Sequence, residues 1–342
     1  MRLRFAAFLI FSALVMPFAS LPAGASTSTD LAAKLPASDG VIVVDPNRLM
    51  NEALPQILSE NPTLLAKINT EISKLSSKTG LDLKKFNSVA IGLNDVTLEG
   101  GGQEYEMVML AKGTVSEKSI KQAASTASKG DFKTKEFKGK KLYLFSVKEL
   151  IDANKPAGAK TGFGEKLMDQ FFGTLNKEVA LTLFDDSTVA FGTPSRVMAA
   201  IEGTTKISPD LLGLLNRKPN SLASLGLNLK DGLSRFFILE EDELGESLGS
   251  VRRLQASFDV NDGVSNLSIA AKTINSESAE GLAFTIQAMT EVFASILKKN
   301  SGADKQVYAR MLENLAVEQN ADEITIDLSV TKADMDVVVG GK

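Results

Sequence analysis

The chain has 342 residues and a formal net charge of −4, a size that suits one large domain or two ordinary ones. It contains no histidine and no cysteine, which excludes Ser-His-Asp triads, thiol nucleophiles, iron–sulfur clusters, haem held by His or Cys, and ordinary zinc sites. Carboxylate chemistry, Ser-Lys chemistry, hard-cation binding or no chemistry remain. We therefore expect no cofactor and no metal site, and a fold whose stability comes from its core alone.

Residues 1–25 have the three parts of a secretory signal peptide. Arg2 and Arg4 form the basic end, residues 5–18 are largely apolar, and residues 23–25 form a small-x-small cleavage site. The apolar run is too short to span a bilayer comfortably. The sequence therefore predicts an exported protein.

We expect cleavage between Ala25 and Ser26, which would leave a periplasmic or extracellular protein. Cleavage removes two arginines and takes the formal charge from −4 to −6. Residues 26–39 form a lead-in to the first strand. No later segment has the unbroken apolar length of a spanning helix, so we expect no transmembrane span in the mature chain.

An apolar strand that turns directly into a helix occurs three times, over residues 41–50, 189–198 and 225–237. In each copy Asn or Ser is followed by Arg and then by two apolar residues. The arginines of the three copies are Arg48, Arg196 and Arg235. We expect each arginine to cover a sheet edge or to donate a hydrogen bond to a strand carbonyl. The alternative is that each binds an anion at a helix start.

The first half alternates further strands and helices. Strands are predicted over residues 89–93, 107–111, 131–136, 141–147, 179–184 and 188–191. Helices are predicted from residue 61 onward and over residues 116–128, 148–153, 165–175 and 207–220. Ser116 is the expected N-cap of the helix over 116–128.

The second half repeats this pattern. Strands over residues 253–260 and 264–273 meet at Asn261-Asp262-Gly263, a strong hairpin signal. Helices over residues 276–299 and 304–319 follow, and a strand over 323–330 comes next. The sequence therefore predicts an α+β fold made of two degenerate copies of one module, with largely antiparallel sheets packed by helices. The modules are residues 40–217 and 221–339, with the boundary at 218–221.

Residues for catalysis are few. Short matches to the elements of penicillin-binding enzymes occur, but in the wrong order along the chain. They are Ser-x-x-Lys at Ser295 to Lys298, Ser-x-Asn at Ser59 to Asn61, and Lys-Thr-Gly at 78–80 and 160–162. Asp185 and Asp186 lie in a tight turn, where Asp is favoured for turn chemistry. Residues 240–243 are four consecutive acids, which lack the alternating spacing of a calcium loop.

Residues 112–148 contain ten lysines against three acids in an otherwise acidic chain. Period-two alternation puts Lys133 and Lys135 on one face of a strand, and a turn adds three more charges at its tip. The residues of this candidate site are Lys133, Lys135, Lys138, Lys140 and Lys141. The lysines either protect an exposed edge strand from aggregation or meet an anionic partner, such as lipid head groups or a cell-wall polymer.

Residues 38–45, 51–55 and 187–203 resemble exported bacterial envelope proteins of unknown function with a duplicated α+β domain. That resemblance implies the same fold over most of the mature chain and brings no catalytic residues. We expect a non-catalytic binding or structural role in the envelope, and another envelope protein is a further candidate partner. The alternative is a hydrolase that uses carboxylates or Ser-Lys chemistry. Nucleic acid is not expected as a partner, because the chain is predicted to be exported and has no aromatic platform interleaved with the lysines.

Overall fold

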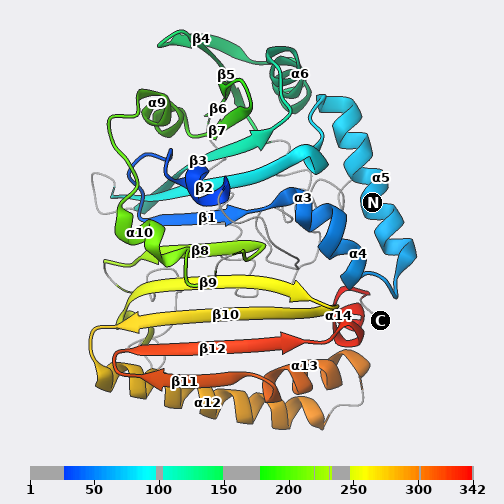
Figure 1. Cartoon of the computed structure of the whole chain (residues 1–342), viewed down its shortest axis with the longest axis vertical. Helices are drawn as coiled ribbons and strands as arrows, with labels where there is room; N and C mark the ends of the chain where they lie inside the picture. The colour runs from blue at the N-terminus through cyan, green and yellow to red at the C-terminus, as the bar shows by residue number, and fades with distance from the viewer. Residues whose placement is uncertain are drawn as a thin grey trace. The chain divides into compact units, whose positions relative to one another are not determined.

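The computed structural model describes residues 27–97, 103–148, 178–218, 220–230, 232, 247–299 and 302–340. The predicted signal peptide, most of the helix over 148–153, the helix over 165–175, Arg235 and the acidic run at 240–243 lie outside these residues. The described chain is α+β, with antiparallel sheets packed by helices, as the sequence predicts (Figure 1). It forms two compact units. The first contains Gly24–Asn47 and Ala66–Leu212, and the second contains Arg48–Leu65 and Gly213–Lys342.

The described part of the first unit contains seven antiparallel strands. They are β1 (Gly40–Val44), β2 (Phe86–Thr97), β3 (Gln103–Gly113), β4 (Lys133–Phe137), β5 (Lys140–Ser146), β6 (Glu178–Asp185) and β7 (Thr188–Gly192). Their order in the sheet is β1-β2-β3-β7-β6-β5-β4. The helices of this unit are α2 (Thr27–Ala32), α6 (Glu117–Ala127) and α9 (Pro194–Glu202), with a short 3₁₀ helix at Leu83–Lys85.

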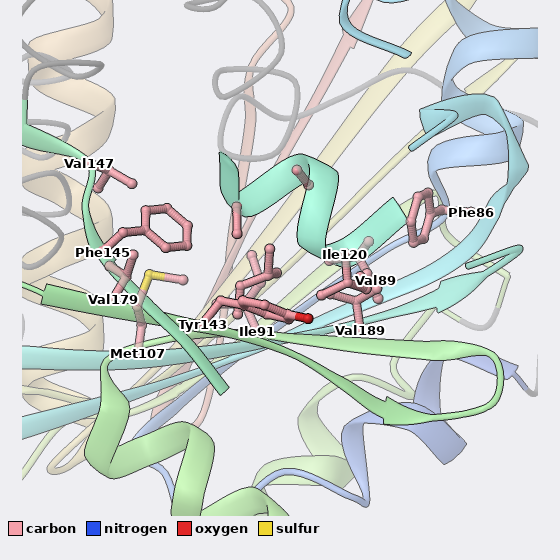
Figure 2. Packing of buried hydrophobic residues seen from close by; sticks show 14 residues of the cluster. Phe86, Val89, Ile91, Met107, Ile120, Tyr143, Phe145, Val147, Val179 and Val189 are labelled. Carbon is pink, nitrogen blue, oxygen red and sulfur yellow. The ribbon is translucent and has the colours of Figure 1, made fainter. Parts of the chain in front are cut away.

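Helix α6 covers one face of this sheet. Figure 2 shows its Ile120 packed over side chains from the strands, among them Ile91, Tyr143 and Val189. Apolar side chains removed from water in this way supply the main favourable term in folding. The N-cap prediction at Ser116 is confirmed, because its Oγ accepts a hydrogen bond from the Ser119 amide at 3.1 Å.

The lead-in to the first strand is part of the core. Residues 27–32 form α2, which packs on β1 and β2. Leu31, Ala32 and Leu35 are buried, with at most 2% of their surface exposed. A helix was not predicted for this segment, because it is short and its apolar residues find partners only after the sheet has formed.

Among its described residues, the second unit has five antiparallel strands. They are β8 (Ala223–Asn228), β9 (Val251–Asn261), β10 (Val264–Thr273), β11 (Ala316–Asn320) and β12 (Glu323–Val330), in the order β8-β9-β10-β12-β11. Its helices are α12 (Ser276–Lys298), α13 (Ala303–Glu313) and α14 (Lys332–Gly340), with a π-helix at Leu49–Ala53 and the short α4 (Leu54–Ile57). Further helices have residues in both units: α3 (Pro46–Arg48), α5 (Pro62–Thr79) and α10 (Pro209–Leu214).

The prediction of a helix over residues 304–319 is wrong at its C-terminal end. Helix α13 stops at Glu313, and residues 316–320 form β11, which pairs with β12. The segment is polar and mostly exposed, so its local sequence shows no strand alternation. Its conformation is set by pairing with the next strand, β12, in a hairpin that turns at residues 321–322, and this pairing overrides the preference of the segment itself.

Two hairpin predictions are confirmed. Asp262 and Gly263 join β9 to β10 with φ of 53° and 78°. Lys138 and Gly139 join β4 to β5 with φ of 46° and 74°. Two consecutive residues with positive φ define the type I′ turn, whose twist matches that of paired strands.

The sheets of the two units share one strand order. The order β1-β2-β3-β7-β6 in the first unit corresponds to β8-β9-β10-β12-β11 in the second. In both, three consecutive strands are followed by the last strand of the unit and then by the strand that precedes it in the chain. In the first unit the hairpin β4–β5 extends this pattern beyond β6. A shared order is compatible with the predicted duplication, which remains a prediction.

Candidate functional site

The lysine-rich hairpin forms the outer edge of the first sheet. We call Lys133, Lys135, Lys138, Lys140 and Lys141 the lysine hairpin. Strand β5 is buried on both faces, with Leu142 and Tyr143 both nearly inaccessible, whereas the residues of β4 are exposed from Lys133 to Glu136. An edge strand covered by lysines is protected from pairing with other chains.

The register of the hairpin divides its lysines between two faces. Lys133 lies opposite Leu144, Lys135 opposite Leu142, and Lys140 opposite Phe137. Directly opposed residues share a face, and alternate residues of one strand share a face. Lys133, Lys135 and Lys140 therefore lie on one face, the face that carries α9, where Lys135 Nζ is 3.6 Å from Met198 Sδ.

Two of the five lysines are ion-paired. Lys138 Nζ lies 3.0 Å from Glu202 Oε1, and Lys141 Nζ lies 3.4 Å from Glu117 Oε1. Both pairs are exposed, so each contributes at most about 1 kcal/mol. Within the described part of the chain, no carboxylate pairs with the three lysines of the α9 face. The positive potential of the hairpin is therefore concentrated on that face.

Arg196 is buried in the first unit and is held by its own chain. Its Nη2 donates to the Ala37 carbonyl at 2.6 Å and to Ser38 Oγ at 2.8 Å. Burial lowers the pKa of the guanidinium, while Glu106 and Asp39 act in the opposite direction. These hydrogen bonds hold the segment that leads into β1 in place. With 9% of its surface exposed, Arg196 presents little surface to an external anion.

Arg48 makes the corresponding contact in the second unit. Its Nη1 donates to the Asn220 carbonyl at 3.0 Å, just before β8, and Nη2 lies 3.7 Å from Asp259 Oδ1. Desolvation raises the pKa of Asp259, and Arg48 opposes that rise. Both described arginines of the repeated strand-helix unit thus donate to a backbone carbonyl that precedes a strand.

The short sequence matches to penicillin-binding enzymes form local contacts. Ser59 Oγ donates to the Gln56 carbonyl at 2.7 Å, and Thr79 Oγ1 donates to the Leu75 carbonyl at 2.8 Å. Ser295 and Lys298 line a hollow of about 720 Å³ between α12 and α13, where Lys298 is ion-paired with Glu313. Both side chains are exposed, whereas a lysine acts as a base when burial removes its proton.

Asp185 occupies the turn between β6 and β7. Partial burial would raise its pKa, but hydrogen bonding from the Ser187 amide at 3.0 Å and from Lys34 Nζ at 3.1 Å outweighs it, and the pKa falls to about 2. The carboxylate is thus fixed in its charged form as a turn residue. This is the turn chemistry expected from the sequence.

We expect Asp185→Asn to weaken the fold near neutral pH by less than about 1 kcal/mol, because the Lys34 pair is exposed. A carboxylate whose pKa is depressed stabilises the folded state above its unfolded pKa of about 4 and loses that contribution as pH falls towards the folded value. The difference between wild type and variant, measured by urea denaturation from pH 6 to pH 3, should therefore shrink below about pH 4. A constant difference would contradict this.

An exposed apolar surface on α12 was not predicted from the sequence. Phe284, Met289, Val292, Phe293 and Ile296 are among the most exposed large apolar side chains of the described residues. The signal was present in the sequence, since these residues add a second apolar side to a helix that already has a core-facing one. Among the described residues, no helix is long and apolar enough to cross a membrane.

The fold and surfaces described here define an α+β protein of antiparallel sheets with a lysine-covered edge. No family model matches the chain, and no curated protein matches it. Solved structures similar to it are crystal forms I, III and IV of TP0453, with 8%, 8% and 9% identity and TM-scores of 0.47, 0.47 and 0.43. The matches cover 92%, 93% and 90% of this chain and 98%, 100% and 95% of the other. At these values the similarity carries no argument about function.

Proposed function

We propose that this protein is an exported, non-catalytic binding protein of the cell envelope and that the lysine hairpin is its contact with an anionic surface. The observation that supports the proposal is the row of Lys133, Lys135 and Lys140 on one face of β4–β5. Their charges are not neutralised by ion pairs to described residues. The partner is a lipid head-group layer or a cell-wall polymer that carries phosphate or carboxylate groups.

Such a surface needs no pocket. A lysine near an anionic membrane contributes about 1 kcal/mol, and the attraction falls off within a Debye length of about 10 Å at 0.1 M salt. Three lysines on one face therefore support weak, salt-sensitive binding. A role in catalysis has less support, since Ser295 and Lys298 are both exposed and Lys298 is already paired with Glu313.

We expect Lys133→Gln, Lys135→Gln and Lys140→Gln together to reduce binding to anionic vesicles or cell-wall material by roughly tenfold to a hundredfold at low salt. Cosedimentation at low and high salt measures this, and high salt should abolish wild-type binding. The two materials, assayed separately, distinguish the lipid from the polymer.

Two further variants serve as controls. Lys138→Gln with Lys141→Gln removes the ion-paired lysines and should have a smaller effect. Changing Lys133, Lys135 and Lys140 to Arg keeps the charge and should preserve binding. Equal binding by wild type and the triple Gln variant, or no binding by wild type at low salt, would contradict the proposal. The lysines would then serve only to protect the edge strand from pairing with other chains.

A further inference from the structure

Helix α12 has two apolar sides. The helix lies beside the sheet of the second unit (Figure 1). One side packs on that sheet through Ala279, Leu282 and Ala283, which are buried. The other faces outward, where the exposed fractions are 72% for Phe284 and 57% for Val292. A contiguous apolar surface that is exposed in the folded chain is characteristic of an interaction site.

The outward residues are contiguous along the helix. With 3.6 residues per turn, side chains four positions apart lie in one row, and residues 284 to 296 extend over about 18 Å. One row contains Phe284, Ala288, Val292 and Ile296, and the adjacent row contains Met289 and Phe293. We call these six residues the α12 strip. Ala288, the smallest of them, lies near its centre.

Charges are placed at opposite ends of the strip. Glu277 lies in the first turn of α12, and Lys299 is the residue that caps its C-terminus. Both side chains are exposed, and neither forms an ion pair with another described residue. Glu277 precedes Ala288 by as many residues as Lys299 follows it. The strip is therefore complementary to itself when two copies run antiparallel.

We propose that the α12 strip binds a second copy of this chain in a two-fold symmetric dimer. The two-fold axis passes near Ala288, where the small side chains let two helices approach closely. Phe284 then packs against Val292 of the second copy, and Glu277 meets Lys299 of the second copy. Nearly antiparallel helices that cross at about 20° keep such contacts along their length. Two-fold dimers of this kind are the commonest symmetric assembly.

The charges of α12 disfavour a lipid surface as the occupant. Helices that lie in a membrane interface carry Lys or Arg along their polar side. The polar side of α12 instead carries Glu280, Gln287 and Glu291, and its one lysine, Lys298, is ion-paired with Glu313. Acidic residues at this position would repel anionic head groups, whereas the acidic and basic ends of two antiparallel copies attract each other.

A single helix pair buries less than the roughly 800 Å² per partner of a standard interface. The dimer is therefore expected to be reversible and to dissociate on dilution. It is independent of the anionic-surface proposal, because the lysine hairpin contributes no residue to it.

Sedimentation equilibrium of the purified protein over a range of concentrations tests the proposal. Wild type is expected to associate, and Ala288→Glu should raise the dissociation constant at least tenfold by opposing two carboxylates across the axis. Gln287→Glu adds the same charge about 100° around the helix from Ala288, on the polar side and outside the α12 strip, and should change association little. Circular dichroism of each variant confirms that the fold is kept, since all these positions are exposed.

A charge exchange identifies the occupant. Glu277→Lys and Lys299→Glu, each alone, should weaken association, and the double variant should restore it, because each end again meets its opposite. Restoration supports a second copy running antiparallel. A wild-type protein that stays monomeric at all concentrations overturns the proposal. Association that is unchanged in the Ala288→Glu variant also overturns it. So does a monomeric wild type that binds neutral phosphatidylcholine vesicles when the Ala288→Glu variant does not.

Discussion

Replacing Gly192 by alanine is expected to destabilise the first unit by more than about 3 kcal/mol. Gly192 has φ of +153°, and a Cβ there would lie 2.2 Å from the Met107 carbonyl oxygen and 2.8 Å from Val108 Cα. Both are backbone atoms of β3, which is paired with β2 on one side and with β7 on the other. The Thr193 amide also donates to the Met107 carbonyl at 3.0 Å, so neither strand can shift without losing hydrogen bonds.

Two glycines provide matched controls for this substitution. Gly139 has φ of +74°, and a Cβ there would meet no described atom within 4 Å, so Gly139→Ala should cost about 1 kcal/mol from backbone strain alone. Gly281 lies in α12 with open space around it, and Gly281→Ala should stabilise by about 0.4–1 kcal/mol. Urea denaturation followed by circular dichroism measures all three. A Gly192→Ala protein as stable as Gly139→Ala would show that β3 and β7 can separate easily.

Replacing Arg196 by methionine should cost about 2 kcal/mol of stability. The variant keeps most of the buried volume but leaves the Ala37 carbonyl and Ser38 Oγ without the Nη2 donor. Hydrogen bonds from a charged donor contribute about 1.5–3 kcal/mol each. Part of that loss is offset because the buried guanidinium, whose pKa is lowered by desolvation, no longer has to be held away from water.

Arg196→Lys tests whether the planar fork of the guanidinium matters, since an ammonium group has a different donor geometry. It should fall between wild type and Arg196→Met. Lys121→Met, at an exposed position of α6, should change stability by less than about 0.5 kcal/mol. If Arg196→Met lowered stability by no more than Lys121→Met does, Arg196 would not stabilise the segment before β1. Anion binding would then be the better explanation for this arginine.

The hairpins show what could be predicted from the sequence. Asp262-Gly263 and Lys138-Gly139 join neighbouring strands. Asp262, Gly263 and Gly139 are residue types that favour positive φ, whereas Lys138 adopts it beside its glycine. The capping Ser116 is likewise recognisable from sequence, because it bonds the amide of Ser119, three residues further on.

The missed features depend on tertiary contacts that the segment's own pattern does not show, and most of these contacts join residues far apart in the chain. Strand β11 is polar and acquires its conformation from β12, and α2 is buried only because the sheet is there to cover it. The partners of Arg196 and Arg48 lie well over a hundred residues away. The ion pairs that divide the lysine hairpin, from Lys138 to Glu202 and from Lys141 to Glu117, depend on where α9 and α6 pack.

The shared strand order has a consequence for the kinetics of folding. Hairpins such as β2–β3, β6–β7 and β9–β10 join strands adjacent in sequence, and isolated hairpins form within about 1–10 μs. The pairing of β3 with β7, which joins Leu110 to Ala190, closes a long loop and forfeits much more chain entropy before any contact is made. We therefore expect the first unit to assemble from hairpins that form first. We expect its slowest step to be the pairing of β3 with β7, where Gly192 lies against the Met107 carbonyl.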